Sequence, residues 1–434
     1  LVISSCSSEK SNALTESDAE AFLQSVELED KTLGPIVSSA YWIGANFITY
    51  DSQKVVADYG KRYQLLALER ARQASSFDEV EVSEENRRKL NLIKSSFVMP
   101  SPLDEALAGE ISSISAELDA MYGAGEHCFS ADDCYDLEAF ENIIDNSRDP
   151  EELLKAWEGW RNIGKPMKDM YLRMVEIGNQ GANDLGYNGL TDLWFSKYDM
   201  PAEDFLDETD RVWDELKPLY DALHCHVRDE LSNFYGENIV SKTGNLPAHV
   251  LGNMWGQSWS NIYDLVYTKQ SKSNSVDVTK IINDKEIDEI EMVEYAEDFF
   301  ISIGFEPLPS TFWERSLFVK PRDRAVVCHA SAWNLDPANN DLRIKMCIQR
   351  NEEDFITIHH ELGHIFYYQA YNHLPTLFQG GANDGFHEAF GDLLTLSITP
   401  DYLTQIGFIS EEEANIAKED PIGLLMKQAL EGVV

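Results

Sequence analysis

Residues 356–368 read ITIHHELGHIFYY, which places three histidines and a glutamate inside an apolar, aromatic run. Buried imidazoles and carboxylates are unfavourable unless something pairs with them. Residues 360–364 have the form H-E-x-x-H, and in a helix His360 and His364 lie one turn apart on the same face. They can therefore share one metal ion, with Glu361 close enough to reach a water on that ion. The alternative is a group of core polar residues satisfied by hydrogen bonds alone.

A third metal ligand is expected downstream of the motif. A metzincin arrangement would need a glycine and a histidine soon after His364, but the next residues, IFYYQAYNH, contain no such glycine, and His373 is wrongly spaced. In GFHEAFGDLLTLS, Glu388 and Asp392 share one helix face. We expect Glu388 to bind the metal and Asp392 to accept a hydrogen bond from a ligand histidine. Three ligands with an open fourth position are typical of a catalytic zinc site.

The neighbouring positions support a buried helix. Phe355, Ile358, Ile365 and Phe366 surround the polar stripe and predict that the helix lies in the core. His359 points away from the ligand face, so we expect its hydrogen bonds to be satisfied within the protein.

Helical periodicity dominates the rest of the chain and predicts a mostly α-helical fold. Apolar residues recur at helical spacing in segments 19–30, 53–74, 103–123, 151–164 and 207–236. Segments 324–333 and 341–349 are rich in β-branched and apolar residues around the turn LDPANN, which predicts one small β-hairpin near the histidine helix.

The composition limits the partners of the chain. There are 76 acidic and 35 basic residues among 434, a net charge of −41, which disfavours binding to nucleic acid. The sequence contains no run of about 18 apolar residues, so we expect no membrane-spanning helix.

The start of the chain, LVISSCSS, is similar to the end of a lipoprotein signal, with Cys6 as the lipidated residue. The alternative is an ordinary terminus with a stray cysteine. We expect residues 1–20 to be a tether and 21–434 a single domain.

The other cysteines favour an oxidising compartment. Cys128 and Cys134 lie in a short polar loop suited to a local disulfide, and Cys328 and Cys347 bracket a second loop. Cys225 lies in a predicted helix, where we expect a buried free thiol. This pattern predicts a periplasmic or extracellular protein, with membrane attachment only through Cys6.

Six separated stretches resemble the angiotensin-converting-enzyme-like peptidyl-dipeptidases: AWEGWRNIG, LPAHVLGNMWGQSWSNIYDLV, VVCHASAW, LRIKMC, HHELGHIFYYQAY and GANDGFHEAFGDLLTLS. The resemblance covers residues from about 150 to the end, in the family's order. It implies a large helical, gluzincin-type metallopeptidase with a deep central cleft and a hairpin beside the zinc helix. The implied reaction is release of C-terminal dipeptides from oligopeptides.

The resemblance also assigns roles to residues. Glu361 would be the general base and later the general acid. His329 would donate to a substrate carbonyl, and the backbones of Ala330 and Ala332 would pair with the peptide as an added strand. Gln257 would help to hold the terminal carboxylate, which favours dipeptide release over single-residue release. The pairs Cys128–Cys134 and Cys328–Cys347 match disulfides of the family.

Three departures from the family pattern qualify these roles. Phe195 stands where members commonly have an arginine that helps to bind chloride, so chloride binding is doubtful. Asp384 replaces a usual proline, which we interpret as a loop change. The family's domain continues beyond Val434 and carries further substrate-binding residues and a tyrosine that stabilises the oxyanion, so we expect this chain to lack them. A zinc carboxypeptidase, an oligopeptidase and a non-catalytic peptide-binding lipoprotein remain alternatives.

Overall fold

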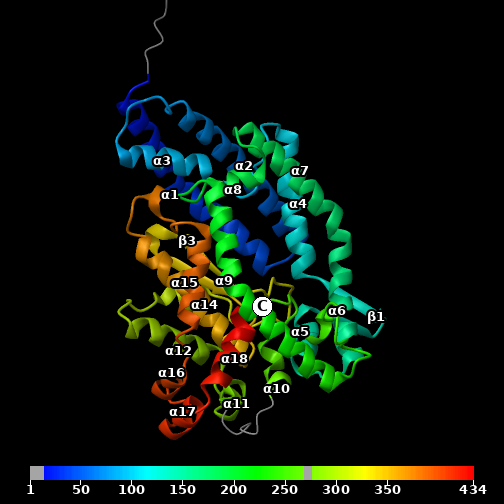
Figure 1. Cartoon of the computed structure of the whole chain (residues 1–434). Helices are drawn as coiled ribbons and strands as arrows, with labels where there is room; N and C mark the ends of the chain where they lie inside the picture. The colour runs from blue at the N-terminus through cyan, green and yellow to red at the C-terminus, as the bar shows by residue number, and fades with distance from the viewer. Residues whose placement is uncertain (1–13, 268–275) are drawn as a thin grey trace, which may run out of the picture.

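The computed structural model describes residues 14–267 and 276–434, and these are mostly helical, as predicted (Figure 1). The helices of the first half are α1 (Glu16–Asn46), α2 (Tyr50–Ser75), α3 (Glu84–Ser95), α4 (Glu105–Gly123), α5 (Leu137–Asn146), α6 (Pro150–Gly164), α7 (Lys168–Asp184), α8 (Leu190–Phe195) and α9 (Ala202–Tyr235). Those of the second half are α10 (Tyr263–Val266), α11 (Val278–Asp284), α12 (Glu289–Ser302), α13 (Ser310–Arg315), α14 (Glu352–Tyr371), α15 (Asp384–Thr395), α16 (Pro400–Gln405), α17 (Glu411–Lys418) and α18 (Pro421–Gly432). The strands are β1 (Glu126–Ser130), β2 (Asp133–Asp136), β3 (Ser331–Asp336) and β4 (Asp341–Lys345).

Helix boundaries follow local capping signals. The Asp149 side chain accepts a hydrogen bond from the Glu151 amide, and Pro150 follows at the first helical position of α6. The first helix extends well beyond the predicted segment 19–30, because a capping box between Thr15 and Asp18 starts it early and Pro35 does not end it.

The two ends of the view in Figure 1 are formed by helices from different parts of the chain. Helices α1 to α3 lie at one end of the view in Figure 1, and α16 and α17 lie at the opposite end. The C-terminus lies near the middle, beside α18 and α9. The largest apolar core joins α12, α13, β4, α14 and α16, so the predicted metal-binding helix α14 passes through it.

The predicted hairpin exists, but its first strand was placed too early. Strand β3 pairs with β4 antiparallel, with Ala332 opposite Ile344. Residues 324–330 are not a strand, because their backbone bonds elsewhere: Val327 N–H donates to Ala45 O, and Ala325 O accepts from Ile48 N–H. The turn between α1 and α2 therefore competes for the groups that a longer ladder would need.

Both predicted disulfides are present, Cys128–Cys134 and Cys328–Cys347. The first closes a small hairpin, β1–β2, where the sequence had suggested only a loop, and the two cysteines face each other across it. The prediction for Cys225 was wrong, because its thiol is free but exposed. Its neighbours Leu223 and Val227 point into the core, and Cys225 lies about 200° around the helix from each.

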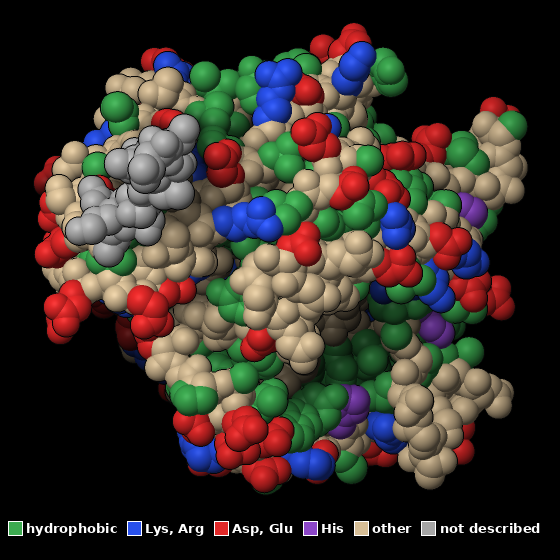
Figure 2. Space-filling view, turned by 90° about the horizontal axis from the view of Figure 1, so that it is seen from above, with side chains coloured by type: hydrophobic (Ala, Val, Ile, Leu, Met, Phe, Trp, Pro, Cys, Tyr) green, Lys and Arg blue, Asp and Glu red, His purple; other side chains and the backbone are tan. Residues whose placement is uncertain are grey.

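Acidic side chains are spread over the face shown in Figure 2, where lysines and arginines are fewer.

Within residues 14–267 and 276–434, no helix combines the length and apolar character needed to cross a bilayer. Cys6 and most of the predicted tether lie outside the described residues. Helix α1 begins at Glu16, four residues before the predicted end of that tether.

Candidate active site

A cleft with a volume of about 2230 Å³ runs between α5, the 253–261 segment, the β3–β4 hairpin, α14, α15 and α18. It is lined by all the residues predicted for metal binding, proton transfer and peptide binding: Gln257, His329, Ala330, Ala332, His360, Glu361, His364, Glu388 and Asp392. Residues more than a hundred positions apart in the sequence therefore meet in one cavity.

Helix α14 holds the motif rigidly. Asn351 caps its first turn by accepting from the Asp354 amide. Phe355, Ile358 and Phe366 are fully buried and fix the helix in the core. Because these side chains are tightly packed, the backbone of α14 cannot shift without opening a cavity, and His360 is therefore held in place.

Three candidate ligands converge at the crossing of α14 and α15. The nearest ligand atoms of His360, His364 and Glu388 all lie within 4.8 Å of one another. Glu388 Oε2 is 3.3 Å from His360 Nε2, and Glu388 Oε1 is 3.6 Å from His364 Nε2. Asp392 Oδ1 lies 3.0 Å from His360 Nδ1, on the other side of that ring. This arrangement leaves both Nε2 atoms directed toward Glu388.

Glu361 gives independent evidence that a further group binds between these side chains. Its side chain is buried, and its Oε2 atom has no hydrogen-bond partner among the described residues. Burial, reinforced by the charge of Glu388, raises the pKa of Glu361 to about 8. At neutral pH this shift keeps the carboxyl group protonated unless a cation or a water favours its charged form, and a buried carboxyl oxygen without a partner is unfavourable. The donor set and the orphaned oxygen thus fit a divalent metal ion with an associated water.

His359 is separate from this group, as predicted. It is fully buried, its Nδ1 lies 2.7 Å from Phe355 O, and its Nε2 lies 2.8 Å from the Tyr402 hydroxyl. Burial lowers its pKa to about 4, so it is a neutral core residue at ordinary pH.

One family model matches almost the whole chain. It is the model described as angiotensin-converting enzyme, and the match runs over residues 13–434. The chain belongs to the angiotensin-converting enzyme family. It is 34% identical to the cattle enzyme over 423 residues, 41% to the pig enzyme over 329 and 34% to the rat enzyme over 426. These alignments cover 96%, 75% and 96% of this chain but only 32%, 25% and 32% of the relatives. The matched part of the chain thus spans a quarter to a third of the length of those enzymes.

In this member of the angiotensin-converting enzyme family, the segment before β3 is held by a lysine that the sequence did not single out. Lys345 is 2% exposed, and its ammonium donates to Val327 O and His329 O, each at 2.6 Å. These carbonyls flank Cys328. Burial lowers the pKa of Lys345 to about 8, and the charge of Glu361 opposes that shift. Nothing in the sequence singled out Lys345, because its partners are backbone carbonyls and no pattern of residue types identifies them.

The predicted peptide-binding positions lie beside this lysine. The His329 ring packs edge-on against Trp255, with 5.5 Å between centroids, and its Nδ1 lies 3.1 Å from Ala330 O. The Tyr368 hydroxyl donates to Ala332 O at 3.4 Å. Both carbonyls thus already have one intramolecular donor, and each retains a second lone pair for a ligand.

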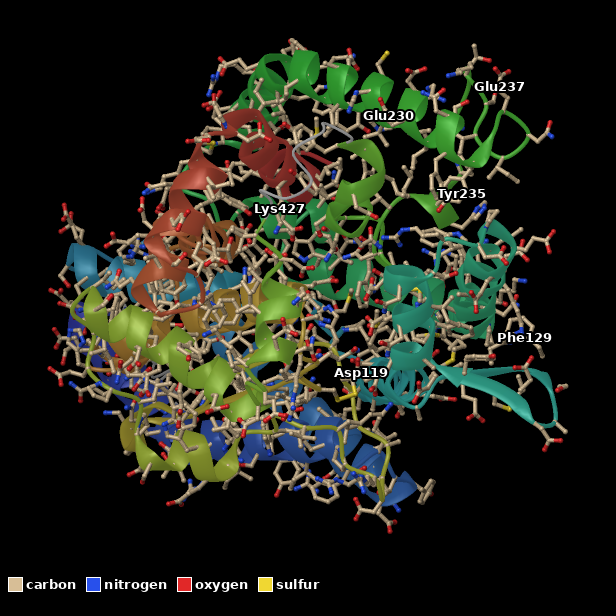
Figure 3. The ribbon with its side chains drawn as sticks, turned by 90° about the horizontal axis from the view of Figure 1, so that it is seen from below. Asp119, Phe129, Glu230, Tyr235, Glu237 and Lys427 are labelled. Carbon is tan, nitrogen blue, oxygen red and sulfur yellow. A yellow bond between two sulfur atoms is a disulfide. The ribbon has the colours of Figure 1, made fainter. Side chains whose placement is uncertain are left out.

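Gln257 is exposed and lies on the 253–261 segment, which lines the cleft. The segment is tied to α18, because Ser258 Oγ donates to Glu431 at 2.6 Å and Trp259 N–H donates to Leu430 O at 2.7 Å. Lys427, near the centre of Figure 3, pairs with Glu352 in the first turn of α14. Helix α18 therefore connects the Gln257 segment to the helix that carries the histidines.

Two other predicted features have clear structural settings. Phe195 ends α8 with its ring against Phe205, 5.3 Å between centroids, so it supplies no positive charge for chloride. Asp384 begins α15, directly after the capping residue Asn383, and so belongs to a helix start.

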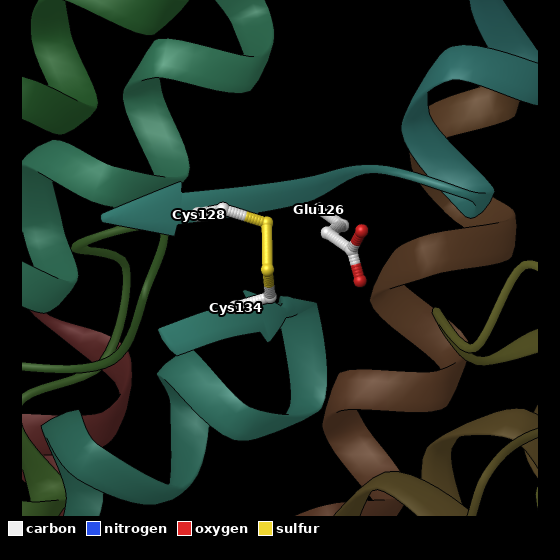
Figure 4. Close-up of side chains that lie close together, drawn as sticks. All are labelled: Glu126, Cys128 and Cys134. Carbon is white, nitrogen blue, oxygen red and sulfur yellow. A yellow bond between two sulfur atoms is a disulfide. The ribbon is translucent and has the colours of Figure 1, made fainter. Parts of the chain in front are cut away.

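A second cluster of possible ligands, Glu126 with Cys128 and Cys134, is exposed. Figure 4 shows that the two sulfur atoms are bonded to each other. A disulfide cannot supply the thiolates that a metal needs, so the cluster is not a metal site.

Proposed function

We propose that this chain carries the metal centre of a zinc peptidase that releases dipeptides from the C-termini of oligopeptides. The observation that carries the proposal is the convergence of His360, His364 and Glu388 beside the orphaned Oε2 atom of Glu361. Membership of the angiotensin-converting enzyme family supports the same reaction class.

In the proposed mechanism, His360, His364 and Glu388 would hold the zinc, which when bound would polarise the scissile carbonyl and make the attacking water more acidic. Glu361 accepts the proton of that water on Oε2 and then gives it to the leaving amine. Asp392 keeps the proton of His360 on Nδ1 and so leaves Nε2 free for the ion.

Substrate would lie along β3 and its preceding residues. Ala330 and Ala332 would pair with the peptide backbone, and Gln257 would bind the terminal carboxylate. His329 would donate to a substrate carbonyl from Nε2. Because Nδ1 faces Ala330 O, which can only accept, this donation requires the proton of the neutral ring to move from Nδ1 to Nε2 or the ring to be doubly protonated. The loss of a chloride site through Phe195 stays a prediction, as does periplasmic or extracellular localisation, which the two disulfides favour.

The test is the mass of the products. The full chain is loaded with zinc and incubated with a short peptide that has a free C-terminus, and the same peptide with an amidated C-terminus is the control. We expect products two residues shorter from the free peptide and little cleavage of the amide. Loss of single residues would indicate a carboxypeptidase, internal fragments an oligopeptidase, and intact peptide with bound zinc a non-catalytic binding protein. Each of those results would overturn dipeptide release.

A further inference from the structure

The two histidines of the motif have different partners behind the proposed metal. His360 faces Asp392, the carboxylate that was expected to accept from one of the two ligand histidines. His364 instead faces His387, the residue immediately before Glu388: its Nδ1 lies 2.7 Å from Nδ1 of the His387 ring, and the His387 main-chain carbonyl also accepts from it. No sequence pattern assigned a role to His387, and the proposed mechanism does not use it.

The ring of His387 is firmly placed. It lies among three tyrosines of α14, with centroid distances of 4.8 Å to Tyr367, 5.0 Å to Tyr368 and 6.3 Å to Tyr371. Its Nε2 atom is 3.3 Å from the Tyr371 hydroxyl. Both ring nitrogens are therefore engaged, one with His364 and one with Tyr371.

Two facing Nδ1 atoms need one proton between them. If His364 offers its Nε2 lone pair to a cation, its own proton must be on Nδ1, which then donates to His387. His387 Nδ1 must be the acceptor, so the proton of that ring lies on Nε2 and points to Tyr371. The opposite assignment would put a proton on His364 Nε2, where the ion would bind, and is incompatible with metal binding.

We propose that His387 is a positioning residue that fixes the tautomer and ring orientation of His364 for the metal. The inference rests on the proposed metal centre but not on peptide cleavage. A partner on the far nitrogen of a metal-binding histidine raises its basicity and holds its ring. In this site the neutral imidazole of His387, on α15, would orient the ring of His364, as the Asp392 carboxylate would orient the ring of His360.

The experiment measures zinc affinity in the full chain by competition with a chromophoric chelator, without peptide. His387→Phe keeps a ring among the tyrosines but removes the acceptor, and we expect it to bind zinc about 10–100-fold more weakly. His387→Asn places an amide oxygen near the position of Nδ1, and we expect it to restore most of the affinity. The absorption spectrum of the cobalt-substituted protein should shift in the Phe variant and return toward wild type in the Asn variant.

Matched variants separate this role from general damage. His373→Phe alters an exposed histidine just after α14 and should leave zinc affinity unchanged. Asp392→Ala should weaken zinc binding by removing the partner of His360. The size of that loss is the reference with which the loss in His387→Phe is compared. Melting of the metal-free proteins identifies variants that fail to fold; if His387→Phe is one of them, Tyr371→Phe, which removes only the hydroxyl behind His387, is compared instead and should shift the cobalt spectrum.

The outcomes are distinct. Unchanged affinity and spectrum in His387→Phe would overturn the inference and would indicate that the His387 main-chain carbonyl, which also interacts with His364, suffices. An Asn variant as weak as the Phe variant would overturn the hydrogen-bonding role. Wild-type protein that binds no zinc would overturn the proposed metal centre itself, whereas zinc binding without peptide cleavage would overturn only the proposed reaction.

Discussion

Gly391 of α15 lies directly against the ring of His360. A Cβ atom on Gly391 would be 2.8 Å from His360 Nδ1 and 2.9 Å from Cε1. On the facing helix, a Cβ on Gly363 would be 3.0 Å from Gly391 Cα. The two helices therefore meet through glycines, and this close approach lets Glu388 reach the histidines of α14.

We expect Gly391→Ala to weaken zinc binding, because the added methyl group must displace the His360 ring. Overpacking of this kind typically destabilises by about 1–3 kcal/mol. Chelator competition and thermal melting measure the two effects. Gly34→Ala is the control: a Cβ on Gly34, inside α1, would have nothing within 4 Å, so the alanine should be neutral or stabilising. Equal zinc affinity in wild type and Gly391→Ala would contradict the importance of this contact.

Glu361→Gln should abolish nearly all peptide hydrolysis while zinc stays bound. The amide keeps the size of the side chain but cannot accept the proton of the attacking water, and loss of a general base typically lowers the rate by about 10²–10⁴-fold. Initial rates and zinc content are measured on the same sample. A variant that cleaves at the wild-type rate would exclude Glu361 as the base.

Lys345→Met should raise KM more than it lowers kcat. The substitution keeps an unbranched chain but leaves the carbonyls of Val327 and His329 without their donor, so the residues along the substrate become less ordered. Leaving such groups unsatisfied typically destabilises by about 1–3 kcal/mol each. Lys280→Met, which removes an exposed pair with Asp284, is the control. A fall in kcat alone, at constant KM, would argue against a role in peptide positioning.

Replacing Cys328 and Cys347 together by serine should lower stability and weaken peptide binding. The bond links residues 19 positions apart and ends next to His329, and a loop of this size contributes about 3 kcal/mol. The matched control replaces Cys128 and Cys134, which close the β1–β2 hairpin, do not line the cleft and should leave KM unchanged. Melting temperatures and peptide KM values distinguish the two bonds. Equal effects on KM would show that only global stability is involved.

Glu141→Gln should stabilise the protein, and the gain should grow with pH. Burial, and then the charge of Asp145, raises the pKa of Glu141 from 4.5 to about 8; Glu353, Asp354 and Glu138 add to the shift. Between these values the unfolded chain has lost the proton while the folded protein keeps it, so this group destabilises the fold progressively as pH rises from about 4.5 to 8. At about 1.4 kcal/mol per pKa unit the effect is on the order of a few kcal/mol. Melting curves at pH 5 and pH 8 test it; a gap between variant and wild type that does not widen would refute the assignment.

Much of this protein could be predicted from local patterns. Helical periodicity and capping residues predicted most of the long helices, because these signals act within a few residues of chain. The spacing of His360 and His364, and of Glu388 and Asp392, likewise predicted which side chains share a face, since that follows from 3.6 residues per turn. The metal-binding role of these residues is a proposal that the geometry supports.

The misplaced strand depended on contacts between distant segments, whereas the exposure of Cys225 follows from local helical spacing that the prediction did not apply. The backbone of residues 324–330 is bonded to the α1–α2 turn and not to β4, and Cys225 is exposed because its neighbours take the core-facing side of α9. The partners of Lys345 and His387 follow no sequence pattern either.

The sequence by itself determined the helices, the motif and the identity of the candidate ligands, because these depend on residue type and local spacing. Only the tertiary structure decided that two glycines allow α14 and α15 to approach, that Lys345 holds the carbonyls beside His329, and that His364 faces His387. Those relationships depend on packing between elements that are remote in the chain. No local periodicity encodes them.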